Sequence, residues 1–122
     1  MGIAKNIVHI FEPNPLACGQ AVLSMLTGVS VENVIGEVGT ERETTLAQMR
    51  EFLQSKGIQM DKCRRSVCDK EELSQIAVLS LETPKCWHWS LYANGIFYDP
   101  EYGILEDFPP SNRRYYWELK DI

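Results

Sequence analysis

The chain contains 122 residues, of which 44% are hydrophobic and 24% are charged. This composition is typical of a globular protein, and we expect residues 1–122 to form a single domain around one core. The net charge of −5 disfavours a nucleic-acid partner, because phosphate binding requires a basic surface. No segment approaches the roughly 18 consecutive apolar residues that a membrane helix needs, so no membrane partner is expected.

The first predicted helix begins at Cys18. Two prolines, Pro13 and Pro15, prevent helix formation just before it and deliver the chain in an extended form. From Cys18 to residue 26 apolar residues recur at helical spacing, and Gly28 is typical of a helix C-terminus. A cysteine is therefore predicted at the N-terminus of an apolar helix.

Capping residues predict three further helices. Ser30 can cap a short helix over residues 31–38. Thr45, with Gln48 three residues later, forms a capping box before a third helix. The same box recurs at residues 69–72 and indicates a short fourth helix.

Beyond these helices the pattern changes to that of a sheet. Four segments have the continuous or alternating apolar pattern of strands, namely 76–81, 87–93, 96–99 and 115–120. Asn94-Gly95 is a strong signal for a two-residue hairpin, because both turn positions require a positive φ. Helices followed by an antiparallel sheet indicate the α+β class.

The hairpin predicts which side chains share a face of the sheet. Pairing outward from Asn94-Gly95 sets Ser90 opposite Asp99, and alternation along the strand puts His88 on the same face as both. Asp99 is then diagonal to His88, about 5 to 8 Å away between backbones, which suits a carboxylate–imidazole hydrogen bond.

These residues suggest nucleophilic catalysis. A thiol needs a base to become a nucleophile, and the base needs an acid to fix its tautomer and orientation. Cys18, His88 and Asp99 supply the three groups, and the amides of the first helical turn favour a thiolate and can face an oxyanion. We expect Gly19 to let a substrate approach that backbone closely. His9 is interpreted as structural.

The other cysteines and the two tryptophans beside His88 are interpreted without a catalytic role. The segment near the N-terminus lacks a long apolar run followed by a cleavage site, so the reducing cytoplasm is expected and the four cysteines are predicted to be free thiols. Their spacing is not that of a structural zinc site, and no metal or cofactor is expected. No role is assigned to the three cysteines other than Cys18. Trp87 and Trp89 flank His88 and are predicted to lie in the core.

The sequence resembles the papain-like cysteine peptidases, and in particular the double-glycine leader peptidases that process bacteriocin precursors, together with their stand-alone relatives. The resemblance covers roughly residues 10 to 105. Three features carry it: the Cys-Gly pair that opens the helix at 18–26, the helix at 45–57, and the strand end at Asp99-Pro100 with Gly103.

The resemblance implies a papain-like fold with N-terminal helices packed on a C-terminal antiparallel sheet. It also implies Cys18 as nucleophile, His88 as base and Asp99 as the orienting acid. The family usually has a glutamine six residues before the cysteine, where its amide helps to form the oxyanion hole, but this chain has Glu12 there. A carboxylate donates only when protonated, so Asn14 is the alternative donor, and we expect its loss to lower activity more than the loss of Glu12.

Three functions remain open from the sequence. The first is a cysteine hydrolase, above all a peptidase, that acts on a peptide or protein substrate. The second is a papain-fold glutamine deamidase or transglutaminase that uses the same triad on a partner protein. The third is a catalytically weak protein-binding module, against which an intact triad argues. The sequence leaves the oligomeric state open.

Overall fold

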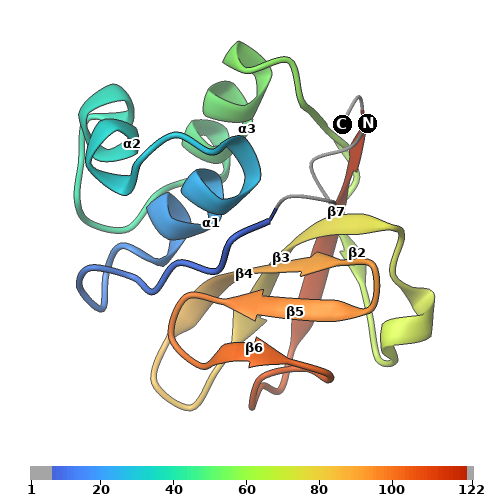
Figure 1. Cartoon of the computed structure of the whole chain (residues 1–122). Coiled ribbons are helices and arrows are strands. Elements are labelled where there is room, and N and C mark those ends of the chain that lie inside the picture. The colour runs from blue at the N-terminus through green and yellow to red at the C-terminus, as the bar shows by residue number, and fades with distance from the viewer. Residues whose placement is uncertain (1–6, 121–122) are drawn as a thin grey trace.

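A computed structural model describes residues 7–120 as three α-helices followed by an antiparallel sheet (Figure 1). The elements are α1 (Cys18–Thr27), α2 (Val31–Val38), α3 (Leu46–Ser55), β1 (Gln59–Met60), β2 (Arg65–Ser66), the 3₁₀ turn η2 (Lys70–Glu72), β3 (Ile76–Glu82), β4 (Trp87–Ala93), β5 (Ile96–Asp99), β6 (Gly103–Leu105) and β7 (Arg114–Lys120). The α+β class predicted from the sequence is confirmed.

Local capping explains where the helices begin and end. Gly28 follows α1 with a φ of 77°, a left-handed conformation that glycine adopts at little cost. The Ser30 side chain accepts a hydrogen bond from the Asn33 amide at the start of α2, and Thr45 and Gln48 form the predicted reciprocal capping box of α3. The predicted fourth helix is only the single 3₁₀ turn η2, although its capping box is present.

The sheet has the strand order β1-β7-β3-β4-β5-β6, and β2 pairs with β7 as well. Within residues 7–120 the strand pairs are all antiparallel, and the four predicted strands are confirmed as β3, β4, β5 and β7. The sequence did not predict β1, β2 and β6, because two- or three-residue strands are too short to show an alternating pattern.

The β4–β5 hairpin sets the geometry of the candidate site. Asn94 and Gly95 form its turn with φ values of 51° and 90°, and Tyr92 pairs with Phe97 as predicted. β5 ends at Asp99, immediately before a proline that has no amide to continue the ladder. The predicted register is therefore confirmed.

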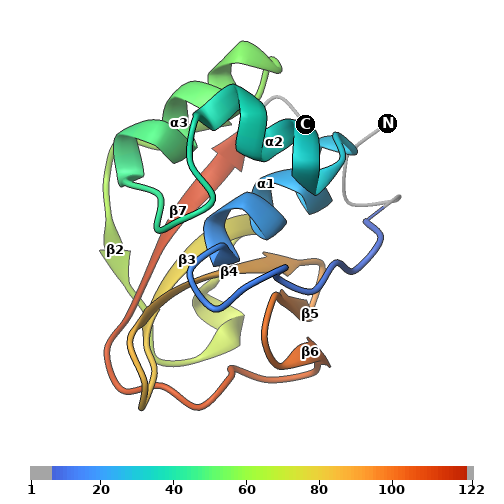
Figure 2. The same ribbon diagram turned by 90° about the vertical axis from the view of Figure 1, so that its left-hand side faces the viewer.

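Two apolar clusters lie on opposite faces of the sheet. The three helices cover one face (Figure 1; Figure 2), and the cluster between them and the sheet contains Val22, Leu26, Met49, Leu53, Val78, Leu91 and Trp117. The other cluster contains Leu79, Tyr92, Phe97 and Tyr116 and is flanked by Phe108. Residues 18–26 of α1 are all buried.

Among the described residues no single helix is long and apolar enough to span a membrane. Taken together, α1 and α2 have the length and composition of a membrane span, but the two helices are bent by 114° relative to each other.

The predicted burial of two tryptophans is only partly correct. Trp89 is half-buried and packs against Trp117, with 5.7 Å between ring centroids. Trp87 is 46% exposed and stacks instead on Tyr115 at the surface. Alternation along β4 correctly predicts that both rings share a face, but it carries no information on how far the helical layer covers that face.

Candidate active site

Cys18 is the first residue of α1 and lies against β4. Its side chain is buried, with 7% of the residue exposed, and the backbone N–H of Trp89 donates a hydrogen bond to Sγ at 3.4 Å. The amides of the first helical turn have no intrahelical acceptor, and the helix dipole favours negative charge at this end. The sulfur therefore lies at the positive end of the helix dipole, beside unpaired backbone amides.

Gly19 serves packing rather than substrate access, which corrects the expectation from the sequence. A Cβ at this position would collide with Thr44 Oγ1 and would lie 3.1 Å from both Met49 Sδ and Trp89 Cδ1. The Trp89 indole also donates to the Thr44 carbonyl oxygen at 3.1 Å. Gly19 thus allows α1 to approach β4 closely enough for Cys18 to reach the backbone of Trp89.

His88 and Asp99 form the hydrogen-bonded pair that the hairpin register predicts. His88 Nε2 lies 2.9 Å from Asp99 Oδ1, and the two residues are 3% and 0% exposed. Because Nε2 is engaged with the carboxylate, Nδ1 is the ring nitrogen left for Cys18. The structure therefore brings Cys18, His88 and Asp99 together from α1, β4 and β5.

The Asp99 carboxylate is held by more groups than the sequence suggested. Ser90 Oγ donates to Oδ2 at 2.7 Å, and the backbone amides of Glu101 and Tyr102 donate to Oδ1 at 2.8 and 2.9 Å. The two amide contacts form an Asx turn, which an Asp-Pro sequence at a strand end could have indicated. His9 Nε2 lies 2.7 Å from the Asp99 carbonyl oxygen, consistent with its structural interpretation.

The His88–Asp99 pair is stabilised with both groups charged. Burial by itself would lower the pKa of His88, but hydrogen bonds to Asp99 and Cys18 outweigh burial and raise that pKa to about 10. Burial likewise opposes ionisation of Asp99, yet the hydrogen bonds, led by that from His88, hold its pKa below the ordinary value. A protonated His88 beside the sulfur can serve as the proton donor to a leaving group.

Glu12 also belongs to this site. One of its carboxylate oxygens, the Cys18 sulfur and a ring nitrogen of His88 lie within 4.8 Å of one another. The Glu12 amide donates to the Pro100 carbonyl oxygen at 2.9 Å, which fixes the N-terminal segment beside the end of β5. Burial, partly offset by His88, raises the pKa of Glu12 to about 7, and its Oε1 atom is buried with no hydrogen-bond partner among the described residues.

Asn14, the other predicted oxyanion donor, has its polar atoms engaged elsewhere. Its Nδ2 atom donates to the Glu41 carbonyl oxygen at 3.3 Å, and its Oδ1 atom accepts from the Leu16 amide at 2.8 Å. The side chain thus holds the segment before α1 against the loop before α3. The structure brings Glu12 to Cys18 and His88, whereas the Asn14 amide contacts Glu41.

Gln20 is a supporting residue that the sequence analysis missed. It is fully buried within α1, and its Nε2 atom donates to the carbonyl oxygens of Thr40 and Arg42 at 2.7 and 2.8 Å. A polar residue inside an otherwise apolar helix could have marked it, since such a group usually has a specific partner. Gln20 anchors the loop that Asn14 also contacts.

An aromatic groove of about 490 Å³ lies on the face of β4 that carries the Trp87 and Trp89 rings. Its lining includes Trp87, Trp89, Tyr115, Trp117 and Leu46, together with Lys62, Arg64 and Ser80. The guanidinium of Arg64 lies 4.1 Å from the centroid of the Tyr115 ring. Trp89 connects this groove to the active-site candidate, because its ring lines the groove while its backbone amide contacts Cys18.

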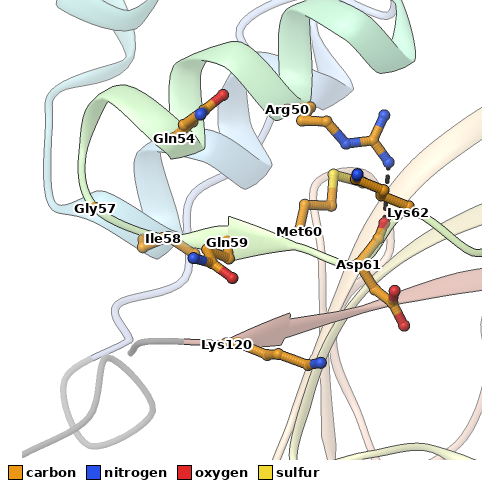
Figure 3. A pocket seen from close by; sticks show the side chains of 9 residues that line it. All are labelled: Arg50, Gln54, Gly57, Ile58, Gln59, Met60, Asp61, Lys62 and Lys120. Carbon is orange, nitrogen blue, oxygen red and sulfur yellow. Dashed lines mark hydrogen bonds between the residues drawn. The ribbon is translucent and has the colours of Figure 1, made fainter.

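A second pocket lies between α3 and β1, away from these residues (Figure 3). Its volume is about 570 Å³, and it is bordered by Arg50, Asp61, Lys62 and Lys120 among others. Arg50 donates to the Asp61 carbonyl oxygen across it at 2.9 Å. Cys18, His88 and Asp99 do not line this pocket, so it has no part in the candidate active site.

Neither a scan against protein-family models nor a search of curated proteins finds a match to this chain. The functional argument therefore depends on the geometry and chemistry of the candidate site.

Proposed function

We propose that this chain is a papain-like cysteine hydrolase that cleaves amide bonds of a peptide or protein. The observation that carries the proposal is the arrangement of Cys18 at a helix N-terminus, His88 beside it, and a buried Asp99 that is 2.9 Å from His88. A buried histidine–aspartate pair next to a thiol matches the requirements of nucleophile, base and orienting acid. The resemblance to double-glycine leader peptidases supports the same chemistry.

In the first half of the proposed reaction the Cys18 thiolate attacks the substrate carbonyl carbon. A carbon–sulfur bond forms, and the carbonyl oxygen becomes an oxyanion facing the first-turn amides of α1. His88 then gives its Nδ1 proton to the leaving nitrogen as the carbon–nitrogen bond breaks. The products of this half are an amine and a thioester on Cys18.

In the second half His88 acts as the base. It takes a proton from water, the resulting hydroxide oxygen bonds to the thioester carbon, and the thiolate leaves. Asp99 holds the ring orientation through both halves, because its hydrogen bond to Nε2 keeps Nδ1 directed at the sulfur. Glu12 is the side chain positioned to donate to the oxyanion when its carboxyl group carries a proton.

The aromatic groove suggests where a substrate lies. Its partly exposed rings, Trp87 above all, offer apolar surface that is connected to the thiol through Trp89, and Arg64 adds a positive charge. Aromatic surface of this kind binds extended apolar segments well. We infer that the substrate presents apolar side chains next to the bond that is cleaved.

The proposal is tested by incubating the protein with a mixture of unrelated peptides and analysing the products by mass spectrometry. We expect cleavage by the natural sequence and no cleavage by Cys18→Ser, a variant that differs by one atom. Cleavage that survives in Cys18→Ser would contradict the proposal. A mass change of amide-to-acid conversion at glutamine without cleavage would instead identify a deamidase.

A further inference from the structure

Three different metal-binding atoms converge at the thiol. A Glu12 carboxylate oxygen, Cys18 Sγ and a ring nitrogen of His88 lie within 4.8 Å of one another. Carboxylate, thiolate and imidazole are the ligands that Zn²⁺ uses in proteins. We propose that Glu12, Cys18 and His88 bind a zinc ion, which reversibly blocks the nucleophile and its base.

The spacing of the three atoms fits such a site after a small adjustment. Zinc–ligand bonds of about 2.0 to 2.3 Å in a tetrahedral arrangement set neighbouring ligand atoms roughly 3.3 to 3.8 Å apart. The observed limit of 4.8 Å exceeds this separation by about 1 Å. Glu12 is only half-buried, so its side chain has room to shift the carboxylate toward the other two ligand atoms.

One carboxylate oxygen of Glu12 lacks a hydrogen-bond partner within the described part of the chain. Its Oε1 atom is buried and accepts no hydrogen bond from any described residue. A buried carboxylate without a partner is costly, and a cation is the partner that its charge favours. Ionised Glu12 and Cys18 together carry two negative charges, which would balance the charge of one zinc ion.

The surroundings of His88 are those of a metal ligand. A zinc-bound histidine commonly donates its other ring N–H to a carboxylate, which fixes the tautomer and raises ligand basicity. His88 Nε2 is 2.9 Å from Asp99 Oδ1, and Ser90 fixes the same carboxylate from its other oxygen. Nδ1 is therefore left to face the cysteine and the ion.

Residue 12 determines whether the site offers zinc a third, charged ligand. A cysteine–histidine pair offers two ligands, and an uncharged amide at position 12 would add little for zinc. Glu12 supplies a third, charged ligand and leaves one coordination position for water. The block of catalysis depends on the proposed function, whereas binding of the ion does not.

Binding is measured in a background in which the exposed thiols Cys63, Cys68 and Cys86 are replaced by serine. We expect one Co²⁺ ion to bind with a thiolate-to-cobalt charge-transfer band, and Zn²⁺ to displace it in calorimetry. Glu12→Gln should weaken the affinity roughly tenfold or more, and Cys18→Ser should abolish the band. Circular dichroism verifies that each variant is folded.

Glu101→Gln is the matched control. Glu101 contributes negative charge near Glu12, but its carboxylate contacts Lys85 Nζ at 2.9 Å and is not among the three converging groups. We expect its loss to leave the metal affinity unchanged. No charge-transfer band, an unchanged affinity in Glu12→Gln, or an equal loss in Glu101→Gln would each overturn the zinc site. Binding at the expected affinity with undiminished peptide cleavage would overturn the block of catalysis and contradict the proposed active site.

Discussion

Replacing Asp99 with Asn is expected to lower kcat/KM for peptide cleavage by a factor on the order of 10² to 10⁴. The carboxylate accepts hydrogen bonds from Ser90 Oγ and two backbone amides, and this network aims its Oδ1 atom at His88 Nε2. The substitution replaces one carboxylate oxygen with an amide NH2 group, which cannot accept a hydrogen bond. At least one of these contacts is therefore lost, and the wrong histidine tautomer can be favoured. The base then fails to present Nδ1 correctly to Cys18.

The measurement compares the turnover of Asp99→Asn with that of the natural sequence, after thermal unfolding has established that both are folded. Ser90→Ala is the control, since it removes one hydrogen bond from Oδ2 and leaves the His88 contact in place. We expect a smaller loss for Ser90→Ala. Full activity in Asp99→Asn would show that Asp99 does not orient the base.

Replacing Glu12 with Ala is expected to lower turnover by roughly 10² to 10³, the usual effect of losing one oxyanion donor. Glu12→Gln should leave turnover equal or higher, because an amide donates at every pH while a carboxyl group must be protonated. Asn14→Ala should have the smaller effect, since its amide contacts the Glu41 carbonyl oxygen instead of the site. This order reverses the expectation drawn from the sequence alone.

Turnover of the three variants on one peptide substrate, measured in metal-free buffer, tests this order. If Glu12→Gln and Glu12→Ala both abolish activity while Asn14→Ala is silent, the carboxylate itself takes part in the chemistry. A plain papain-like mechanism would then be the wrong description of the protein.

The local parts of the site were predictable because short-range signals encode them. The hairpin at Asn94-Gly95 fixes the register of β4 and β5, and this register alone puts His88 and Asp99 on one face. The start of α1 at Cys18 follows from the prolines before it.

The conformation of the N-terminal segment was not predictable in the same way. The Asn14 amide donates to the Glu41 carbonyl oxygen, and the backbone N–H of Glu12 donates a hydrogen bond to the Pro100 carbonyl oxygen, which holds Glu12 at the site. Both contacts join residues far apart in the sequence, so no local pattern reports them. Gly19 was misjudged for the same reason, because its neighbours Thr44 and Trp89 belong to other parts of the chain.

The central claim, that Cys18 is an activated nucleophile, is tested most directly by the alkylation rates of the four cysteines in the folded, metal-free protein. Iodoacetamide is added at neutral pH, and labelled peptides are quantified over time by mass spectrometry. Cys63, Cys68 and Cys86 are exposed, whereas Cys18 is 7% exposed, so accessibility alone predicts that Cys18 reacts last. We predict that Cys18 reacts first and that His88→Ala abolishes this advantage. Labelling of Cys18 at or below the rate of the three exposed thiols would contradict the account.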